Sequence, residues 1–125
     1  MKYKIDVVRI RENSIELNGW VIGKTPQSRA EFQVQDGNRK PVEFRYVATR
    51  RDDVSQIYYK QVYDRDYGFD IRFPYTRGAD YWLLIRCDGK TARIKFNEEL
   101  IAKRASVAHK RMEKIRDLMN METVR

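Results

Sequence analysis

The side chains best suited to chemistry lie in one short segment, Arg50-Arg51-Asp52-Asp53. Two guanidinium groups beside two carboxylates could hold a sugar hydroxyl or a phosphate, because a guanidinium presents its donors as a planar fork. The pattern is also typical of a structural role, in which Asp52 or Asp53 caps a helical turn and an arginine pairs with it. The structural role is the more common one for aspartates at turns.

Tyrosines are concentrated just after this segment, at positions 58, 59, 63 and 67. A tyrosine ring offers a flat apolar face together with a hydroxyl group, which suits a sugar ring or a protein partner. The same rings could instead cover the edge of a sheet. If the segment binds a ligand, we expect the contacts to come from Arg50, Arg51, Asp53, Tyr58, Tyr59 and Tyr63.

No set of side chains for catalysis can be assembled from the sequence. The only histidine, His109, has no partner at catalytic spacing, and the only cysteine, Cys87, alternates with apolar residues as a buried side chain does. Asp64, Asp66 and Asp70 could offer oxygen atoms to Ca²⁺, but their spacing lacks the glycine and the final glutamate of a calcium loop. We therefore expect no enzymatic activity, no metal and no cofactor in this chain.

The chain carries 26 Lys and Arg against 18 Asp and Glu, which gives a net charge of +8. Such a charge favours contact with an anionic polymer or an anionic membrane surface. The excess is spread thinly, since residues 97–125 hold seven basic and five acidic side chains and residues 1–96 hold nineteen and thirteen. Because no block of like charge forms, we expect no nucleic-acid partner, while peripheral membrane contact stays an alternative.

A chain of 125 residues favours a single domain of ordinary size. With one cysteine no intrachain disulfide can form, and the first residues lack the apolar run of a signal peptide. No stretch reaches the roughly 18 apolar residues of a membrane span. We therefore expect a cytoplasmic protein, with a position at the inner membrane surface as the alternative.

Apolar and polar residues alternate in the segment from Ser14 to Gly23, which predicts a central strand. At Gly19 the pattern changes, because Trp20 and Ile22 fall on the face that was polar before it. Either Gly19 is a bulge that reverses the register, or the second face of the strand is covered.

Similar alternation predicts strands at residues 3–10, 30–35, 42–48, 69–73, 81–87 and 92–96. The turn sequences Asp36-Gly37-Asn38 and Asp88-Gly89 each predict a hairpin between the two strands that flank them. Residues 49–66 show no regular pattern, so we expect an irregular loop there.

These strands follow one another without helical patterns between them, which favours an all-β fold of antiparallel strands. We expect an antiparallel β-sandwich, Ig-like or jelly-roll-like, in residues 1–96, with a small five-stranded barrel as the alternative. Residues 97–125 are expected to form a C-terminal amphipathic helix that Asn97 caps. The apolar stripe of this helix comprises Ile101, Ala105, Ala108, Met112, Ile115 and Met119.

Three uses of this stripe stay open. It could pack on a second apolar face offered by the sheets, it could pair with another helix, or it could belong to a connector that leads to a following domain. The second apolar face would consist of Trp20, Ile22, Trp82 and Leu84.

Three short stretches resemble a known module when they are taken in order. They are Ile15-Glu-Leu-Asn-Gly-Trp-Val-Ile22, Val47-Ala-Thr-Arg-Arg-Asp-Asp-Val54 and Tyr67-Gly-Phe-Asp-Ile-Arg-Phe-Pro74. Together they resemble the β-sandwich module that precedes the catalytic domain in family 2 glycosyltransferases of Gram-positive bacteria, enzymes that build cell-surface polysaccharides. The catalytic family's own Asp-x-Asp motif is matched here only in letters, by Asp64-Arg65-Asp66, outside any Rossmann-like unit.

The resemblance implies a non-catalytic accessory module that positions the enzyme or its acceptor glycan, with a catalytic domain following in the parent chain. A protein-interaction or oligomerisation domain that acts through the C-terminal helix is the first alternative. A basic nucleic-acid-binding domain is the second alternative, and the net charge alone favours it.

Overall fold

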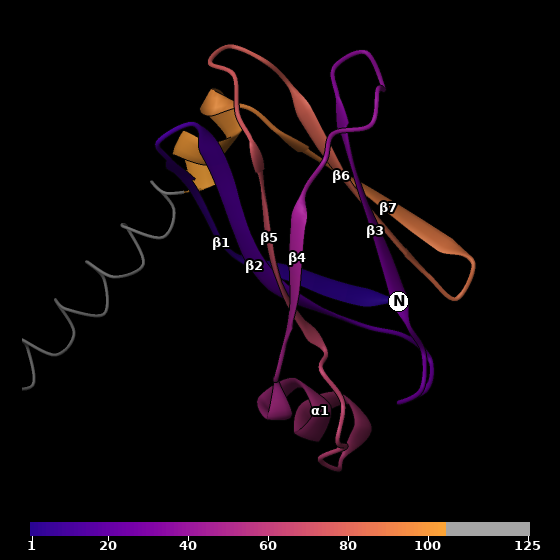
Figure 1. The fold of residues 1–125 in the computed structure, drawn as a ribbon. Coiled ribbons are helices and arrows are strands. Elements are labelled where there is room, and N and C mark those ends of the chain that lie inside the picture. The colour runs from indigo at the N-terminus through magenta and orange to yellow at the C-terminus, as the bar shows by residue number, and fades with distance from the viewer. Residues whose placement is uncertain (105–125) are drawn as a thin grey trace, which may run out of the picture.

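The computed structural model describes residues 1–104, which form two antiparallel sheets around one core (Figure 1). The first sheet has the strand order β1-β2-β5-β4, and the second has the order β3-β6-β7. The strands are β1 (Lys2–Arg11), β2 (Ser14–Ile22), β3 (Ala30–Asp36), β4 (Arg45–Thr49), β5 (Gly68–Pro74), β6 (Tyr81–Cys87) and β7 (Lys90–Phe96). The antiparallel, two-sheet character predicted from the sequence is confirmed.

The core lies between the two sheets and follows the period of two that the sequence showed. Alternate residues of the central strands point inward and exclude water almost completely. Each such aliphatic or aromatic side chain contributes about 1.5–3 kcal/mol on burial, so these strands supply most of the driving force for folding. The most deeply buried members are Ile15 and Leu17 of β2, Phe69, Ile71 and Phe73 of β5, Leu83 and Ile85 of β6, and Phe96 of β7.

The hairpin predicted between residues 30–35 and 42–48 is wrong. Strand β3 pairs with β6 and β4 pairs with β5, so the chain crosses from one sheet to the other after the turn. Only a short contact remains, in which Val42 N donates to Val34 O at 2.8 Å and Gln35 bridges Pro41. Pro41 has no N–H to extend the ladder, and Val42 and Phe44 turn their side chains onto the core at the crossing.

The second predicted hairpin is correct, since β6 pairs with β7 across Asp88 and Gly89. Both turn residues adopt positive φ angles, 53° for Asp88 and 74° for Gly89, as the tight two-residue turn requires. The Asp88 carboxylate also accepts hydrogen bonds from Lys24 N at 2.7 Å and from Ser28 Oγ at 2.9 Å. These bonds lower the pKa of Asp88 and fasten this turn to the segment between β2 and β3.

At Gly19 the second of the two alternatives is correct, because the far face of β2 is covered. The register shift lies in β1 instead, between Ile5 and Val7. Trp20 and Ile22 pack against Val54, which lies in a helix, and against Tyr67, which follows that helix. This helix, α1 (Asp52–Tyr59), lies within the segment that was predicted to be irregular, and with the loop after it covers Trp20 and Ile22 on this face of β2.

The C-terminal helix begins as predicted. Leu100 N donates to the Asn97 side-chain oxygen at 2.9 Å, and residues 98–104 are helical. Ile101 is buried in the main core, so the first residue of the stripe is used inside the domain. The other five stripe residues, and His109, lie outside the described residues. Figure 1 places α1 and residues 98–104 at opposite ends of the sheets. Within residues 1–104, no helix has the length and apolar character needed to cross a membrane.

The backbone of β1 lies so close to Gly19 of β2 that the position has no room for a side chain. A Cβ atom there would meet the Lys4 carbonyl oxygen at 2.1 Å. We expect Gly19→Ala to lower the free energy of unfolding by about 1–3 kcal/mol in urea, because the β1 backbone must move.

Gly37→Ala is the matched control for this experiment. The nearest atom to a Cβ at Gly37 lies 3.7 Å away, which is an ordinary contact. Its free energy of unfolding should stay within about 0.5 kcal/mol of the parent value. Equal stability of the two variants would contradict the close approach.

Candidate functional site

The predicted ligand segment consists of α1 and the loop that follows it, and it lies beyond the ends of β4 and β5 (Figure 1). The structure brings Arg50, Arg51 and Asp53 together at the start of α1, where Arg51 occupies the N-cap position. It does not gather Asp64, Asp66 and Asp70, since no group of three or more acidic, His or Cys side chains that could hold a metal ion occurs among residues 1–104.

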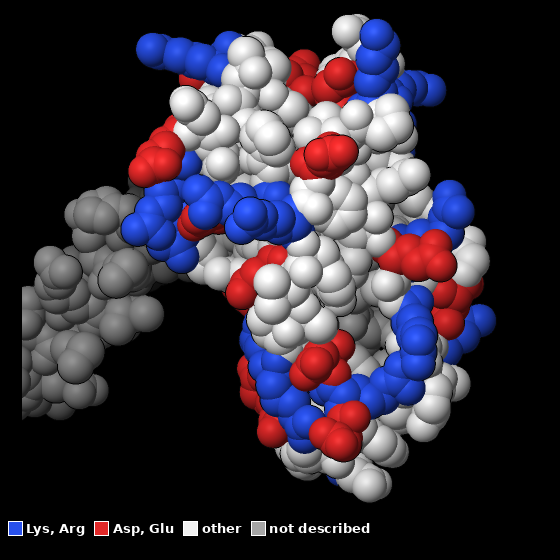
Figure 2. All heavy atoms as spheres, in the orientation of Figure 1, with Lys and Arg blue, Asp and Glu red and all other residues white. Residues whose placement is uncertain are grey.

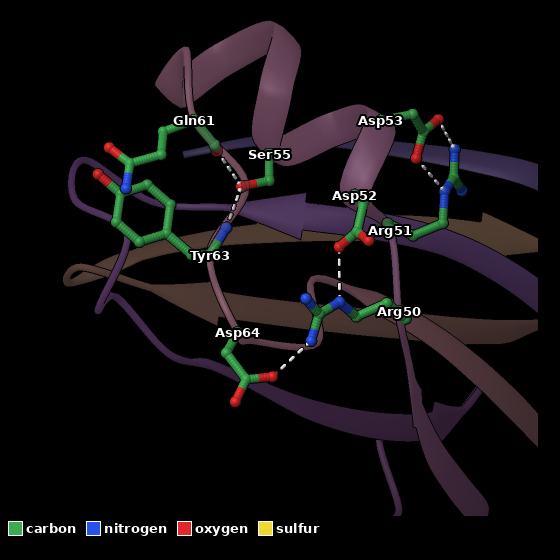
Figure 3. A network of polar contacts seen from close by, with 8 residues as sticks. All are labelled: Arg50, Arg51, Asp52, Asp53, Ser55, Gln61, Tyr63 and Asp64. Carbon is green, nitrogen blue, oxygen red and sulfur yellow. Dashed lines mark hydrogen bonds and ion pairs between the residues drawn. The ribbon is translucent and has the colours of Figure 1, made fainter.

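Both arginines are engaged by carboxylates of the chain itself (Figure 3). Arg50 donates from Nε to Asp52 at 2.5 Å and from Nη1 to Asp64 at 2.6 Å. Arg51 donates from Nε and Nη2 to the two oxygens of Asp53, each at 3.0 Å. Any ligand at this point would have to compete with these internal partners.

Arg51 also connects two distant elements. Its Nη1 donates at 2.7 Å to Asp6, the residue at which the register of β1 shifts. The hydrogen bonds to Asp53 and Asp6 raise the pKa of Arg51, and those from Arg51 lower the pKa of Asp53. The arrangement therefore holds the start of α1 against the bulge of β1. The predicted pairing of arginine with aspartate is present, but the predicted cap is wrong, because Arg51 holds the N-cap position and no side chain caps α1.

Ser55, in the middle of α1, makes polar contacts with the loop that follows the helix. Its side chain is fully buried, donates to Gln61 O at 2.6 Å and accepts from Tyr63 N at 3.2 Å (Figure 3). Lys60 ends the helix in the left-handed conformation, with φ at 61°. These contacts fix the path of the loop from the helix back to β5.

The predicted tyrosines divide into two groups. Tyr59 and Tyr63 are half-buried and meet edge to face at 6.1 Å. The Tyr59 hydroxyl shares its proton between Gly23 O at 2.8 Å and Thr25 O at 2.9 Å, and burial raises the pKa of Tyr59 to about 12. Tyr58 is exposed, with its ring 5.2 Å from that of Trp20. The Lys2 ammonium lies 4.9 Å from the centre of the Tyr58 ring. Ligand binding by these residues stays a prediction.

A hollow of about 170 Å³ borders this loop, beside Arg65, Asp66 and Tyr67. None of the six residues predicted to contact a ligand lines it. The segment therefore offers few free groups, and a ligand site must be sought elsewhere in the described part of the chain.

The outward face of the sheet β1-β2-β5-β4 carries such groups. Arg9, Glu16, Arg72 and Arg45 stand opposite one another on the four neighbouring strands and form one row across the sheet. We call these four residues the arginine row. Figure 2 shows basic side chains forming a band over this face.

Within the arginine row the charges are unequally paired. Glu16 lies between two guanidiniums, 3.4 Å from Arg9 Nε and 3.6 Å from Arg72 Nη1. Arg45 has no ion pair with any residue in 1–104. The row thus carries three positive charges against one negative charge.

Two shallow hollows adjoin this row, and Arg45 and Arg72 line both of them. The first, of about 300 Å³, also presents Asn18 and Asp70. The second, of about 470 Å³, extends past Ser14 to the end of β5. Because the two share their central arginines, we treat them as one groove along β5 and β4, the row groove.

Sequence reasoning missed this groove, although a signal was present. All four members of the arginine row occupy polar positions in alternating strands, which places them on outward faces. Their alignment depends on the register of three strand pairs, one of which joins strands far apart in the sequence. The prediction that β4 pairs with β3 removed Arg45 from the sheet that contains the others.

The remaining candidates have structural surroundings. Cys87 is buried, and burial raises the pKa of its thiol, which disfavours the nucleophilic thiolate. Trp20 is buried beneath α1. Trp82 is half-buried on the second sheet, with the Arg93 guanidinium 4.7 Å from its ring centre.

No protein-family model matches this chain, and a search of the curated proteins found no match.

The hydrogen bonds of Tyr59 give a test of the anchoring role. Tyr59→Phe removes the donor to Gly23 O and Thr25 O, and we expect the free energy of unfolding to fall by about 1 kcal/mol. Tyr58→Phe is the control, since the Tyr58 hydroxyl makes no hydrogen bond within residues 1–104. If both variants unfold at the same urea concentration, Tyr59 does not anchor this loop.

The lowered pKa of Asp53 predicts a dependence of stability on pH. A carboxyl whose folded-state pKa lies below its unfolded value of about 3.9 stabilises the fold above that value, and this contribution is lost as the pH falls through the folded-state pKa. We expect Asp53→Asn to weaken the acid dependence of unfolding below about pH 4, by less than about 1 kcal/mol because the pair is exposed.

Glu43→Gln is the control for the acid titration, because Glu43 has no ion pair among the described side chains. Chemical unfolding at a series of pH values measures both variants. A parent-like acid profile for Asp53→Asn would show that the Arg51–Asp53 contact adds nothing to stability.

Proposed function

We propose that this chain is a non-catalytic β-sandwich module that binds and positions glycan, the accessory part of a glycosyltransferase that acts in cell-surface polysaccharide synthesis. The observation that carries the proposal is the row groove, which charged, amide and apolar side chains line along β5 and β4. Three sequence stretches, taken in order, resemble the accessory module of such enzymes, and this resemblance supports the enzymatic context.

The chemistry of the row groove suits carbohydrate. Guanidinium donors, the Asn18 amide and the Asp70 carboxylate alternate within one hollow, and each can exchange hydrogen bonds with sugar hydroxyls. Val47 adds an apolar contact, of the kind that the C–H face of a sugar ring requires. These groups stand on paired strands, so little backbone conformational entropy is lost when a ligand binds.

The proposed module would act beside a catalytic domain that follows residues 97–125 in the parent chain. It would work in the cytoplasm, at the inner surface of the membrane where such an enzyme assembles its polymer. In this proposal the module takes no part in bond making or breaking. It binds the glycan and positions it for the catalytic domain.

NMR titration of the 15N-labelled chain with bacterial cell-surface oligosaccharides tests this proposal. We expect millimolar ligand to shift the backbone amides of β2, β4 and β5 around Glu16, Val47 and Arg72, with smaller shifts elsewhere. Shifts confined to residues 50–67 would move the site to the α1 segment. No shift in either region would remove glycan binding from the proposed function.

A further inference from the structure

Arg45 and Arg72 form a like-charged pair at the centre of the row groove. They are directly opposite residues of the neighbouring antiparallel strands β4 and β5, and both side chains are exposed. Directly opposite residues have Cβ atoms about 4.5–5.5 Å apart, and like charges at that position are unfavourable to the sheet. An anion placed between the two guanidiniums would relieve this repulsion.

The surrounding carboxylates are insufficient to neutralise the pair. Glu16 lies closest, but it is shared with Arg9, and its distances of 3.4 and 3.6 Å are those of loose contacts. The strong arginine pairs of this chain are closer, as in the contact of 2.7 Å between Arg51 and Asp6. The Arg45–Arg72 pair therefore has donors free for an incoming oxygen.

Acidic residues within the groove restrict the kind of anion. Asp70 and Glu16 line one hollow, and Glu43 lines the other. A membrane surface or a densely charged polymer would bring its negative charges against these carboxylates. A ligand with one anionic group surrounded by hydroxyls would instead pair its anionic group with the arginines. Its hydroxyl groups would donate hydrogen bonds to the carboxylates.

The absence of aromatic residues from the hollow around Asn18 excludes a second class of ligand. Single-stranded nucleic acids bind on stacking platforms formed by aromatic rings. The residues of this hollow offer none, since its lining consists of aliphatic, amide and charged side chains. The hollow around Asn18 therefore lacks the stacking platform that such nucleic acids use.

We propose that the Arg45–Arg72 pair is the anion subsite of the row groove and that it binds a saccharide bearing a phosphate or carboxylate group. This inference rests on the proposed glycan-binding function and adds the ligand class. The acidic sugar lies between the two guanidiniums, and the neighbouring sugars occupy the hollows on either side of them. Glu16 and Asp70 accept hydrogen bonds from hydroxyl groups of the same chain.

Binding of matched saccharides by defined variants tests this subsite. The probes are a galactose tetramer in which one sugar is replaced by galacturonate, the neutral galactose tetramer, the same tetramer bearing one phosphate group, and inorganic phosphate. The variants are Arg45→Gln and Arg72→Gln, with Arg86→Gln as the matched control, because Arg86 is exposed on the outward face of the other sheet. Dissociation constants are measured at low salt by calorimetry or NMR, and thermal unfolding verifies that each variant is folded.

We expect one or both acidic saccharides to bind at least about ten-fold more tightly than the neutral tetramer. Arg45→Gln and Arg72→Gln should each weaken that binding by about ten- to one hundred-fold, as expected for loss of hydrogen bonds to a charged group. Arg86→Gln should leave it unchanged.

The outcomes separate this inference from the function on which it rests. Equal affinity for acidic and neutral tetramers would overturn the anion subsite and leave glycan binding in place. Equal losses in all three variants would assign the effect to net charge and also overturn the subsite. Inorganic phosphate that binds as tightly as the phosphorylated saccharide would overturn the saccharide class, and failure of every saccharide to bind would overturn both proposals.

Discussion

Strand β2 is buried on both faces over its second half, and the rest of the structure depends on this constraint. From Gly19 to Ile22 every residue is buried, although the strand began with one polar face. The inner face packs in the main core, and the outer face needs a separate cover. That cover is α1 with the loop behind it, which forms a second, smaller apolar cluster around Trp20.

Polar contacts hold this cover in place. Arg51 links α1 to the bulge of β1, Ser55 fixes the loop after the helix, and Tyr59 fastens the helix to the segment after β2. The residues that looked suited to ligand binding in the sequence are used here for support. Arginine–aspartate pairs and tyrosine hydroxyls serve both purposes, so composition alone does not distinguish them.

Local patterns in the sequence were sufficient for the strands and for some of the turns. Alternation identified all seven strands within a few residues, Asp88-Gly89 identified the β6–β7 hairpin, and Asn97 identified a helix start. The pairing of the strands was harder to predict, because the turn sequence Asp36-Gly37-Asn38 favoured a hairpin between neighbouring strands. The sheet pairing of β4 follows from the crossing at Pro41, which depends on how the whole core is filled.

The candidate groove was not predicted from the sequence for the same reason, because it depends on which strands pair. Arg9, Arg45 and Arg72 are isolated charges along the chain, and they become neighbours only through the order β1-β2-β5-β4. The α1 helix was missed because its eight residues include only two aliphatic side chains, Val54 and Ile57, which are too few to show a helical period. Its stability comes from packing on Trp20 and Ile22 more than from helix propensity.

The bulge at Asp6 has a consequence for the behaviour of the protein in concentrated solution. Strand β1 is the outermost strand of its sheet, and its unpaired backbone groups could template pairing with another molecule. A bulge interrupts the flat ladder that such pairing needs, and basic side chains along the strand repel an identical neighbour. The bulge to which α1 is fastened therefore also protects the exposed edge of the sheet against aggregation.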